Sequence, residues 1–139
     1  MLWNEIDKWI KKHPNSIIKD ENFFFTYKDF GKEVEFIANK LSGLFISGCK
    51  CAVLCEENMY TALCILACWK SGIIPIPMSI AYGADHCKKI INLTNPDIIL
   101  SDTNINDYFD NEPIDVLRVK AIEIFKLNES ITIEESLFD

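Results

Sequence analysis

Residues 51–101 read CAVLCEENMYTALCILACWKSGIIPIPMSIAYGADHCKKIINLTNPDIILS, and this stretch decides the fold. Its first five residues are a continuous apolar run, which is typical of a strand buried on both faces of a parallel sheet. Asn58 is placed to cap the next helix, which is apolar throughout residues 62–69 and ends at Ser71-Gly72. The opening of this stretch therefore predicts a buried strand followed by a buried helix.

A second strand follows at residues 73–77. Because Pro75 and Pro77 lie two residues apart, both missing N–H groups fall on the same side, and we expect the chain to leave the sheet near Pro77. A further helix follows this strand and ends at Asn95-Pro96. A third strand at residues 97–101 comes directly after it.

Three strands separated by two helices, with short joints, form a βαβαβ unit over residues 50–102. Such a unit requires right-handed crossovers and a parallel sheet with helices on its faces. The sequence therefore predicts an α/β fold with a mostly parallel sheet. The second of these two helices begins at Gly83 and Asp85, and its expected inner face holds Cys87, Ile90, Ile91 and Thr94.

Before this unit, the sequence predicts a short helix over residues 2–12, because apolar residues recur there at helical spacing. Two short β-rich runs, residues 16–19 and 22–25, indicate a small hairpin. Thr26 offers a hydroxyl cap for a longer amphipathic helix. Its apolar face is expected to hold Phe30, Val34, Ile37, Leu41 and Phe45.

Length and composition limit the number of domains and the classes of partner that this chain can have. The chain has 139 residues, about one domain. Its net charge is −7 and no segment gathers basic and aromatic residues, which argues against a nucleic-acid partner. Residues 103–139 carry weaker signals: a polar loop, one or two strands between residues 116 and 127, and an acidic tail. We treat residues 1–139 as one unit with this poorly defined continuation. The 49 % of hydrophobic residues is high for so small a chain.

Two sequence features bear on the compartment. The longest uncharged runs are shorter than a membrane-spanning helix, so we expect no membrane span. The first residues include Glu5 and Asp7 where a signal peptide carries basic residues, so we expect a cytoplasmic chain.

Six cysteines lie within residues 49–87. Their apolar neighbours indicate reduced thiols that serve as small hydrophobic side chains rather than a disulfide framework. Cys64 and Cys68 share a helix face, and a thiolate metal site is geometrically conceivable. However, the spacing is not Cys-x-x-Cys, so we expect no metal site. The remaining cysteines are Cys49, Cys51, Cys55 and Cys87.

A ligand of a doubly wound sheet binds beyond the carboxyl ends of its strands. The turn after the first strand is Glu56-Glu57-Asn58, which has no glycine and places two carboxylates where a pyrophosphate would lie. Gly31-Lys32-Glu33 lies within a predicted helix and cannot cradle a phosphate. The residues themselves therefore disfavour a dinucleotide cofactor and show no nucleotide site.

Nucleophilic and acid–base candidates are equally weak. Asp85, His86 and Cys87 are consecutive, and consecutive residues on a helix do not face each other. Glu56-Glu57 and Glu134-Glu135 are adjacent carboxylates, expected to be solvated rather than a general acid and base. The sequence thus predicts no catalytic, cofactor-binding or metal-binding residue in this chain. The tryptophans Trp3, Trp9 and Trp69 are expected to be core or interface aromatics.

Several stretches together resemble the start of the adenylate-forming (AMP-binding) superfamily, which comprises acyl-CoA synthetases, luciferases and the adenylation domains of nonribosomal peptide synthetases. FTYKDF at residues 25–30 resembles the motif (L/F)-(T/S)-Y-x-E-L, and WKSGIIPIP at residues 69–77 resembles L-K-A-G-x-x-Y-x-P. ANKL at residues 38–41 is similar to A-N-x-L. CAVLCEEN at residues 51–58 and DIILSD at residues 97–102 resemble the family strands V-A-I-L-L-x-N and A-K-V-L-I-T-D.

The order and spacing of these matches agree with the family over residues 23–102, about the first quarter of its usual length. The sequence departs from the family at Trp69, Pro75 and Met78-Ser79. The resemblance implies an enzyme that uses ATP and Mg²⁺ to convert a carboxylate into an acyl-adenylate, then transfers the acyl group to a thiol. Its phosphate loop, its ribose- and Mg²⁺-binding acids and its catalytic lysine match no position here. We expect this chain alone to be inactive and to bind no ATP.

An alternative is a non-catalytic interaction module, standing alone or as a split subunit. The helix that is apolar all round over residues 62–69 motivates it, because a surface helix keeps a polar face. Under either interpretation the expected partner is the remainder of the adenylation domain or another chain. We also expect self-association through apolar surface near this helix or at the sheet edge.

Overall fold

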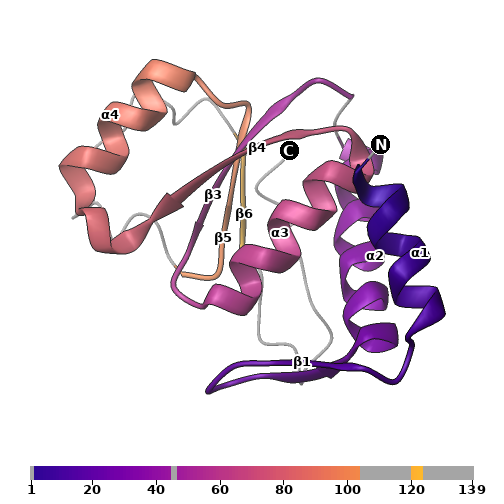
Figure 1. The fold of residues 1–139 in the computed structure, drawn as a ribbon. Helices are drawn as coiled ribbons and strands as arrows, with labels where there is room; N and C mark the ends of the chain where they lie inside the picture. Colours follow the sequence, from indigo (N-terminus) through magenta and orange to yellow (C-terminus); the bar gives the residue numbers. More distant parts are fainter. Residues whose placement is uncertain (1, 45–46, 104–119, 124–139) are drawn as a thin grey trace.

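The computed structural model describes residues 2–44, 47–103 and 120–123. Within them the chain forms a parallel sheet with helices on both faces, preceded by a helix and a hairpin (Figure 1), which confirms the predicted α/β fold. In chain order the elements are α1 (Leu2–Lys12), β1 (Ile17–Lys19), β2 (Phe24–Thr26), α2 (Tyr27–Leu44), β3 (Lys50–Cys55), α3 (Asn58–Ser71), β4 (Ile74–Ser79), the 3-10 helix η1 (Ile80–Tyr82), α4 (Ala84–Thr94), β5 (Ile98–Ser101) and β6 (Lys120–Glu123).

The elements before the main sheet follow their sequence signals. β1 and β2 pair antiparallel, with Ile18 opposite Phe25, as the predicted hairpin requires. Thr26 caps α2, since its Oγ1 accepts a hydrogen bond from the backbone N–H of Asp29 at 3.1 Å. Phe45 lies outside the described residues. The other residues of the predicted apolar face are buried: Phe30, Val34, Ile37 and Leu41.

The strands of the main sheet are all parallel, in the order β4-β3-β5-β6. The chain passes from β3 to β4 on one side and then returns across β3 to β5 on the other. The strand order therefore reverses between β3 and β5. β6 falls within the region where strands were expected, residues 116–127.

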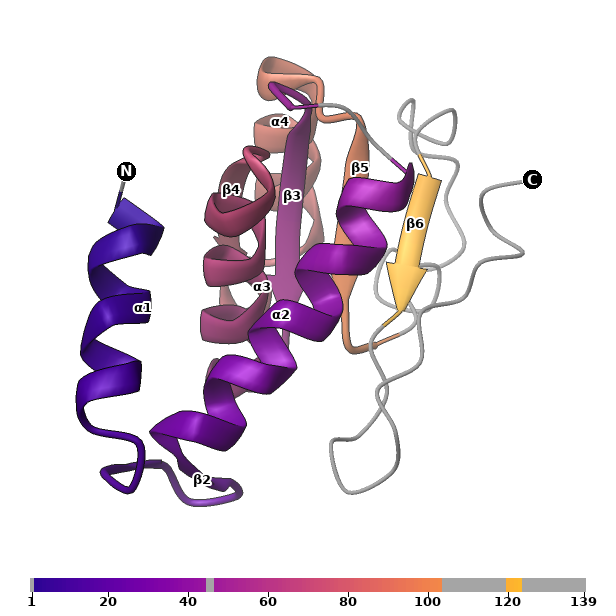
Figure 2. The same cartoon turned by 90° about the vertical axis from the view of Figure 1, so that its right-hand side faces the viewer.

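Side chains alternate between the two faces of the sheet. Cys51 and Val53 of β3 belong to the core formed with α1, α2 and α3, whereas Ala52 and Leu54 belong to the core formed with α4. Figure 2 shows α4 behind the sheet and α2 and α3 in front of it. The central strands are consequently buried on both faces, as the apolar run at residues 51–55 predicts.

The prediction that the chain leaves the sheet near Pro77 is wrong. β4 stays paired with β3 as far as Ser79, opposite Cys55. The backbone N–H of Ile74 donates to the carbonyl of Cys49 at 2.8 Å, so alternate residues of β4 face β3 and both prolines turn their nitrogens to the open edge. The prolines therefore mark β4 as an edge strand among the described strands, not a core strand that ends early.

The position of α3 explains why residues 62–69 of this helix are apolar on every side. It lies between the sheet and the helices α1 and α2 (Figure 1), and none of residues 62–69 is exposed. The helix ends at Gly72, whose φ of +74° suits a residue without a side chain. Among the described helices, none is long and apolar enough to cross a membrane. Residues 62–69 are thus buried or half-buried within the chain, and the half-buried ones include Ala62 and Leu66.

Candidate functional site

The carboxyl ends of β3 and β5 meet at the point where the strand order reverses, the usual ligand position in an open parallel sheet. The predicted turn residues Glu56 and Glu57 follow β3, and Asp102 follows β5. The Asp102 carboxylate accepts two hydrogen bonds from this turn. Its Oδ1 is 2.8 Å from the Glu56 nitrogen, and its Oδ2 is 3.0 Å from the Glu57 nitrogen. Asp102 therefore fastens the end of β5 to the start of α3.

The same turn is fastened to the hairpin. Asn22 Nδ2 donates to Glu57 Oε2 at 2.9 Å, and the Asn22 backbone N–H donates to Asp20 Oδ1 at 2.9 Å. The hydrogen-bonded residues come from the hairpin loop, the β3–α3 turn and the end of β5. Hydrogen bonds between residues far apart in the sequence thus connect the hairpin, the β3–α3 turn and β5 at this end of the sheet.

The charges at this end of the sheet oppose an anionic ligand. The amides of Glu56 and Glu57 immediately precede α3, where a phosphate would accept hydrogen bonds, and Asp102 already occupies them. Burial raises the pKa of the Asp102 carboxyl above its ordinary value, and this outweighs the lowering by its amide hydrogen bonds. The nearby Glu57 raises this pKa further. The residues at the carboxyl ends of β3 and β5 do not fit a triphosphate.

Sequence reasoning placed Glu56 and Glu57 here but assigned no role to Asp102. An acidic residue directly after the third strand, at the predicted reversal point, is the signal that could have identified it. The predicted Asn58 cap is wrong. Glu57 is the N-cap residue and makes no side-chain cap hydrogen bond; its carboxylate instead accepts the hydrogen bond from Asn22.

The cysteines lie mainly in the core, and all six are free of disulfides. Burial raises the pKa of the Cys51 and Cys64 thiols, and hydrogen bonds to Cys68 and Cys55 raise it further. A thiolate is the form that binds metals and attacks electrophiles. In the described part of the chain, no group of histidine, cysteine and acidic side chains is arranged to hold a metal ion. These thiols pack as small hydrophobic groups.

The side chains of the consecutive residues Asp85, His86 and Cys87 lie in different environments. Asp85 and His86 are exposed, and the His86 ring lies against Tyr82 with 5.2 Å between ring centres. The Cys87 thiol is buried beneath α4 and hydrogen-bonds the Ser79 carbonyl at 3.5 Å. The three side chains do not form a catalytic group. The pair Glu134-Glu135 lies outside the described residues.

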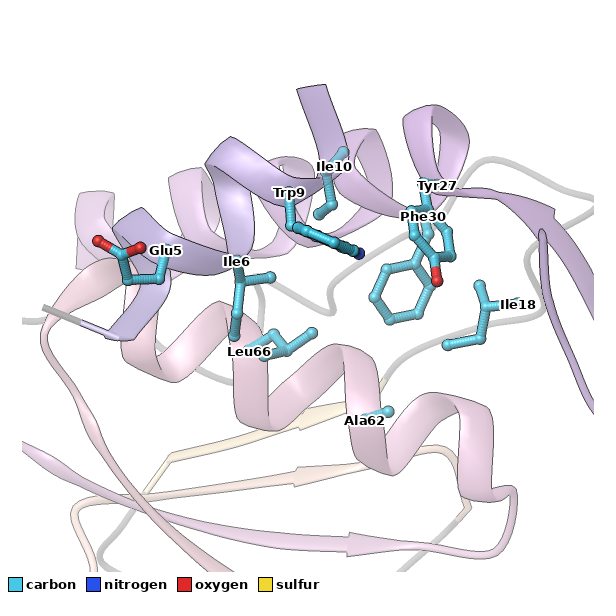
Figure 3. A pocket seen from close by; sticks show the side chains of 9 residues that line it. All are labelled: Glu5, Ile6, Trp9, Ile10, Ile18, Tyr27, Phe30, Ala62 and Leu66. Carbon is cyan, nitrogen blue, oxygen red and sulfur yellow. The ribbon is translucent and has the colours of Figure 1, made fainter. Parts of the chain in front are cut away.

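An apolar groove of about 530 Å³ lies between α1, the hairpin, α2 and α3 (Figure 3). Trp9 lies at its rim with 56 % of its surface exposed, whereas Trp3 is buried and Trp69 is half-buried. At Gly31, where α2 passes α1, an added Cβ would lie 3.2 Å from Ile10 Cγ2. Sequence reasoning missed this groove, because α1 and α3 meet only in the folded chain. Its lining is Glu5, Ile6, Trp9, Ile10, Ile18, Tyr27, Phe30, Ala62 and Leu66.

Comparison with protein families gives a match to the AMP-binding enzyme family over residues 6–136. Among curated proteins, malformin synthetase mlfA of Aspergillus luchuensis is 29 % identical over 119 residues. This alignment covers 84 % of the chain and 2 % of that synthetase. The chain therefore spans a very small part of the curated relative it matches.

Solved structures share the fold. A mutant form of coronafacic acid ligase from Pectobacterium brasiliense matches with a TM-score of 0.77 and 15 % identity, covering 98 % of this chain and 28 % of that one. The N-terminal subdomain of Klebsiella oxytoca NpsA, in complex with 3-hydroxyanthranilyl-AMSN, matches with a TM-score of 0.73 and 16 % identity. That match covers 86 % of this chain and 30 % of the subdomain.

Proposed function

The chain belongs to the AMP-binding enzyme family, and from this membership we propose that it is the N-terminal part of an ATP-dependent, carboxylate-activating ligase. The complete enzyme would join a carboxylate to AMP, release pyrophosphate and transfer the acyl group to a thiol. This chain would supply the first part of the fold, since it covers 28 % of the ligase and 30 % of the NpsA subdomain it resembles. Its own role would be structural.

One observation carries the structural role. Asp102 occupies the two backbone amides at the sheet's ligand position, and Glu56 and Glu57 add further carboxylates. A polyphosphate at this position would have to displace one carboxylate and approach two others, which electrostatics opposes. This supports placing the ATP-binding and catalytic residues of the complete enzyme outside this chain.

ATP and Mg²⁺ are the ligands that we propose for the complete enzyme. The described residues at the reversal point do not fit a triphosphate, for the reasons just given, and no group of acidic, histidine and cysteine side chains in the described part of the chain is arranged to hold a metal ion. We derive no reaction step through either ligand. The carboxylate substrate would be selected elsewhere in the complete enzyme. For the compartment we propose the cytoplasm, since the free buried thiols suit a reducing environment.

ATP titration by calorimetry and ATP–pyrophosphate exchange test the proposal on the 139-residue chain. We expect no heat of ATP binding in the micromolar range and no exchange with any carboxylate, while an active adenylation domain responds in parallel. Micromolar ATP affinity in this chain would overturn the structural role. Circular dichroism of the same sample shows whether the chain is folded during the measurement.

The second candidate is a non-catalytic interaction module on the same scaffold. The groove beside α1 is the observation that favours it, and α3 contributes Ala62 and Leu66 to the lining of this groove. The reading frame downstream of Asp139 distinguishes the two. A continuous frame that encodes a glycine-rich phosphate loop supports the ligase, whereas a stop codon followed by a separate gene for the remainder supports the module.

A further inference from the structure

We propose that the face formed by α1 and its apolar groove is a self-association surface that mates with the same face of a second copy of this chain. This inference goes beyond the proposed function, because it concerns the described residues whether or not a longer polypeptide activates a carboxylate. The groove is lined in part by Ala62 and Leu66, so the contact includes one side of the helix at residues 62–69.

The other exposed regions fit a partner less well. At the open edge of β4, Ile74 is exposed, but Pro75 and Pro77 remove the N–H groups that an added strand would need. On the opposite layer Leu93 is 86 % exposed, but it stands between the exposed polar residues Lys89 and Asn92 on α4. On the α1 face, by contrast, the exposed aromatic residue Trp9 borders an apolar groove.

This face combines an apolar groove with a half-exposed aromatic side chain, Trp9, that lines it. Trp9 exposes about half of its surface at the rim, and Leu2 lies two turns earlier on the same side of α1. The groove beside it, about 530 Å³, is within the size range of pockets that enclose aromatic groups (Figure 3). A two-fold axis would place Trp9 of each copy in the groove of the other. Such self-complementarity is what an isologous dimer requires.

The charges of α1 favour an antiparallel pair of helices. Glu5 lies one turn before Trp9 and Lys12 lies one turn after it, on the same flank. In an antiparallel arrangement, Glu5 of each copy would face Lys12 of the other, and Lys8, which pairs with Glu5 of its own copy, would lie near the two-fold axis. Glu5 contacts Lys8 at 3.4 Å, but both side chains are highly exposed, so this pair is weak and can be exchanged.

Sedimentation velocity across the micromolar to millimolar range tests the proposal. We expect the chain to dimerise and Trp9→Glu to weaken dimerisation by more than about tenfold, because central aromatic anchors dominate interfaces. Leu93→Glu is the matched control: it places the same charge at an exposed apolar residue in the opposite layer and leaves the dimer unchanged. Circular dichroism confirms that both variants are folded.

Three outcomes would overturn the proposal: a monomeric chain throughout this range, equal effects of Trp9→Glu and Leu93→Glu, or a dimer that is lost on Ile74→Glu. A charge exchange tests the orientation. Glu5→Lys should weaken the dimer, and adding Lys12→Glu in the same chain should restore it; failure to restore it would refute the antiparallel pair. These experiments measure the mass of the particle and not ATP binding. A negative result would therefore refute the dimer without refuting the proposed ligase role.

Discussion

Replacing Asp102 tests whether a carboxylate from β5 holds the β3–α3 turn. In Asp102→Ala the amides of Glu56 and Glu57 lose an ionised acceptor at 2.8 and 3.0 Å. Hydrogen bonds to charged groups contribute about 1.5–3 kcal/mol each, and water can reach this turn, so we expect a loss of about 2–4 kcal/mol of unfolding free energy. Asp102→Asn keeps one acceptor oxygen and should lose about half as much.

Urea denaturation followed by circular dichroism measures these losses, and amide hydrogen exchange locates them. The Glu56 and Glu57 amides should exchange much faster in Asp102→Ala than in the unmodified chain. Asp97→Ala is the matched control, since its Oδ2 accepts one backbone N–H, from Lys50 at 2.8 Å, and Asp97 is exposed. It should cost about 1 kcal/mol. Equal losses at both positions, or unchanged exchange of the two amides, would refute the reasoning.

The pH dependence of the same variant has a definite sign. Burial raises the pKa of Asp102 above its ordinary 3.8, so the folded chain holds this proton more tightly than the unfolded chain. The contribution of Asp102 to stability therefore falls as the pH rises from 3.8 through the folded pKa, and it is constant above that. The stability difference between the unmodified chain and Asp102→Asn should be larger at low pH than at neutral pH. A difference that grows toward neutral pH would contradict the raised pKa.

Two further predictions concern the backbone and the thiols. Gly72→Ala should cost about 1–2 kcal/mol in urea denaturation, because φ is +74° and the new Cβ would lie 2.6 Å from Ser47 Oγ. Gly43→Ala, a helical position with open space, should instead gain up to about 1 kcal/mol; equal effects would refute this account. Iodoacetamide should modify half-buried Cys49 in the folded chain, detected by mass spectrometry, and should spare buried Cys64, whose thiol pKa burial raises. Labelling of Cys64 at the rate of Cys49 would contradict that assignment.

Much of the fold could be predicted because its signals are local. The apolar face that includes Val34 and Ile37 identifies α2, and the run at residues 51–55 identifies a strand buried on both faces, since periodicity reports how many sides of an element are covered. The prolines of β4 were a local signal whose meaning depended on context. Pro75 and Pro77 remove N–H groups on one side, but only the sheet order shows that this side is an open edge.

The position of the candidate site could be predicted from the sequence, but the hydrogen bonds within it could not. Parallel topology places Glu56 and Glu57 at the reversal point, so their carboxylates could be weighed against a phosphate from the sequence. Their hydrogen bonds to Asp102 and Asn22 join residues from separate elements, and no spacing rule encodes such pairs. The same holds for the groove at Trp9, whose walls come from α1, the hairpin, α2 and α3.

The sequence by itself determined the elements, the parallel βαβαβ class and the family resemblance over residues 23–102, because helix caps, apolar runs and short joints act between neighbours in the chain. Only the tertiary structure decided which faces are covered. It buried the apolar helix α3 beneath α1 and α2, closed the reversal point with Asp102 and left Trp9 exposed beside a groove. Burial and charge pairing depend on how the layers pack, and that is set by contacts between residues distant in the sequence.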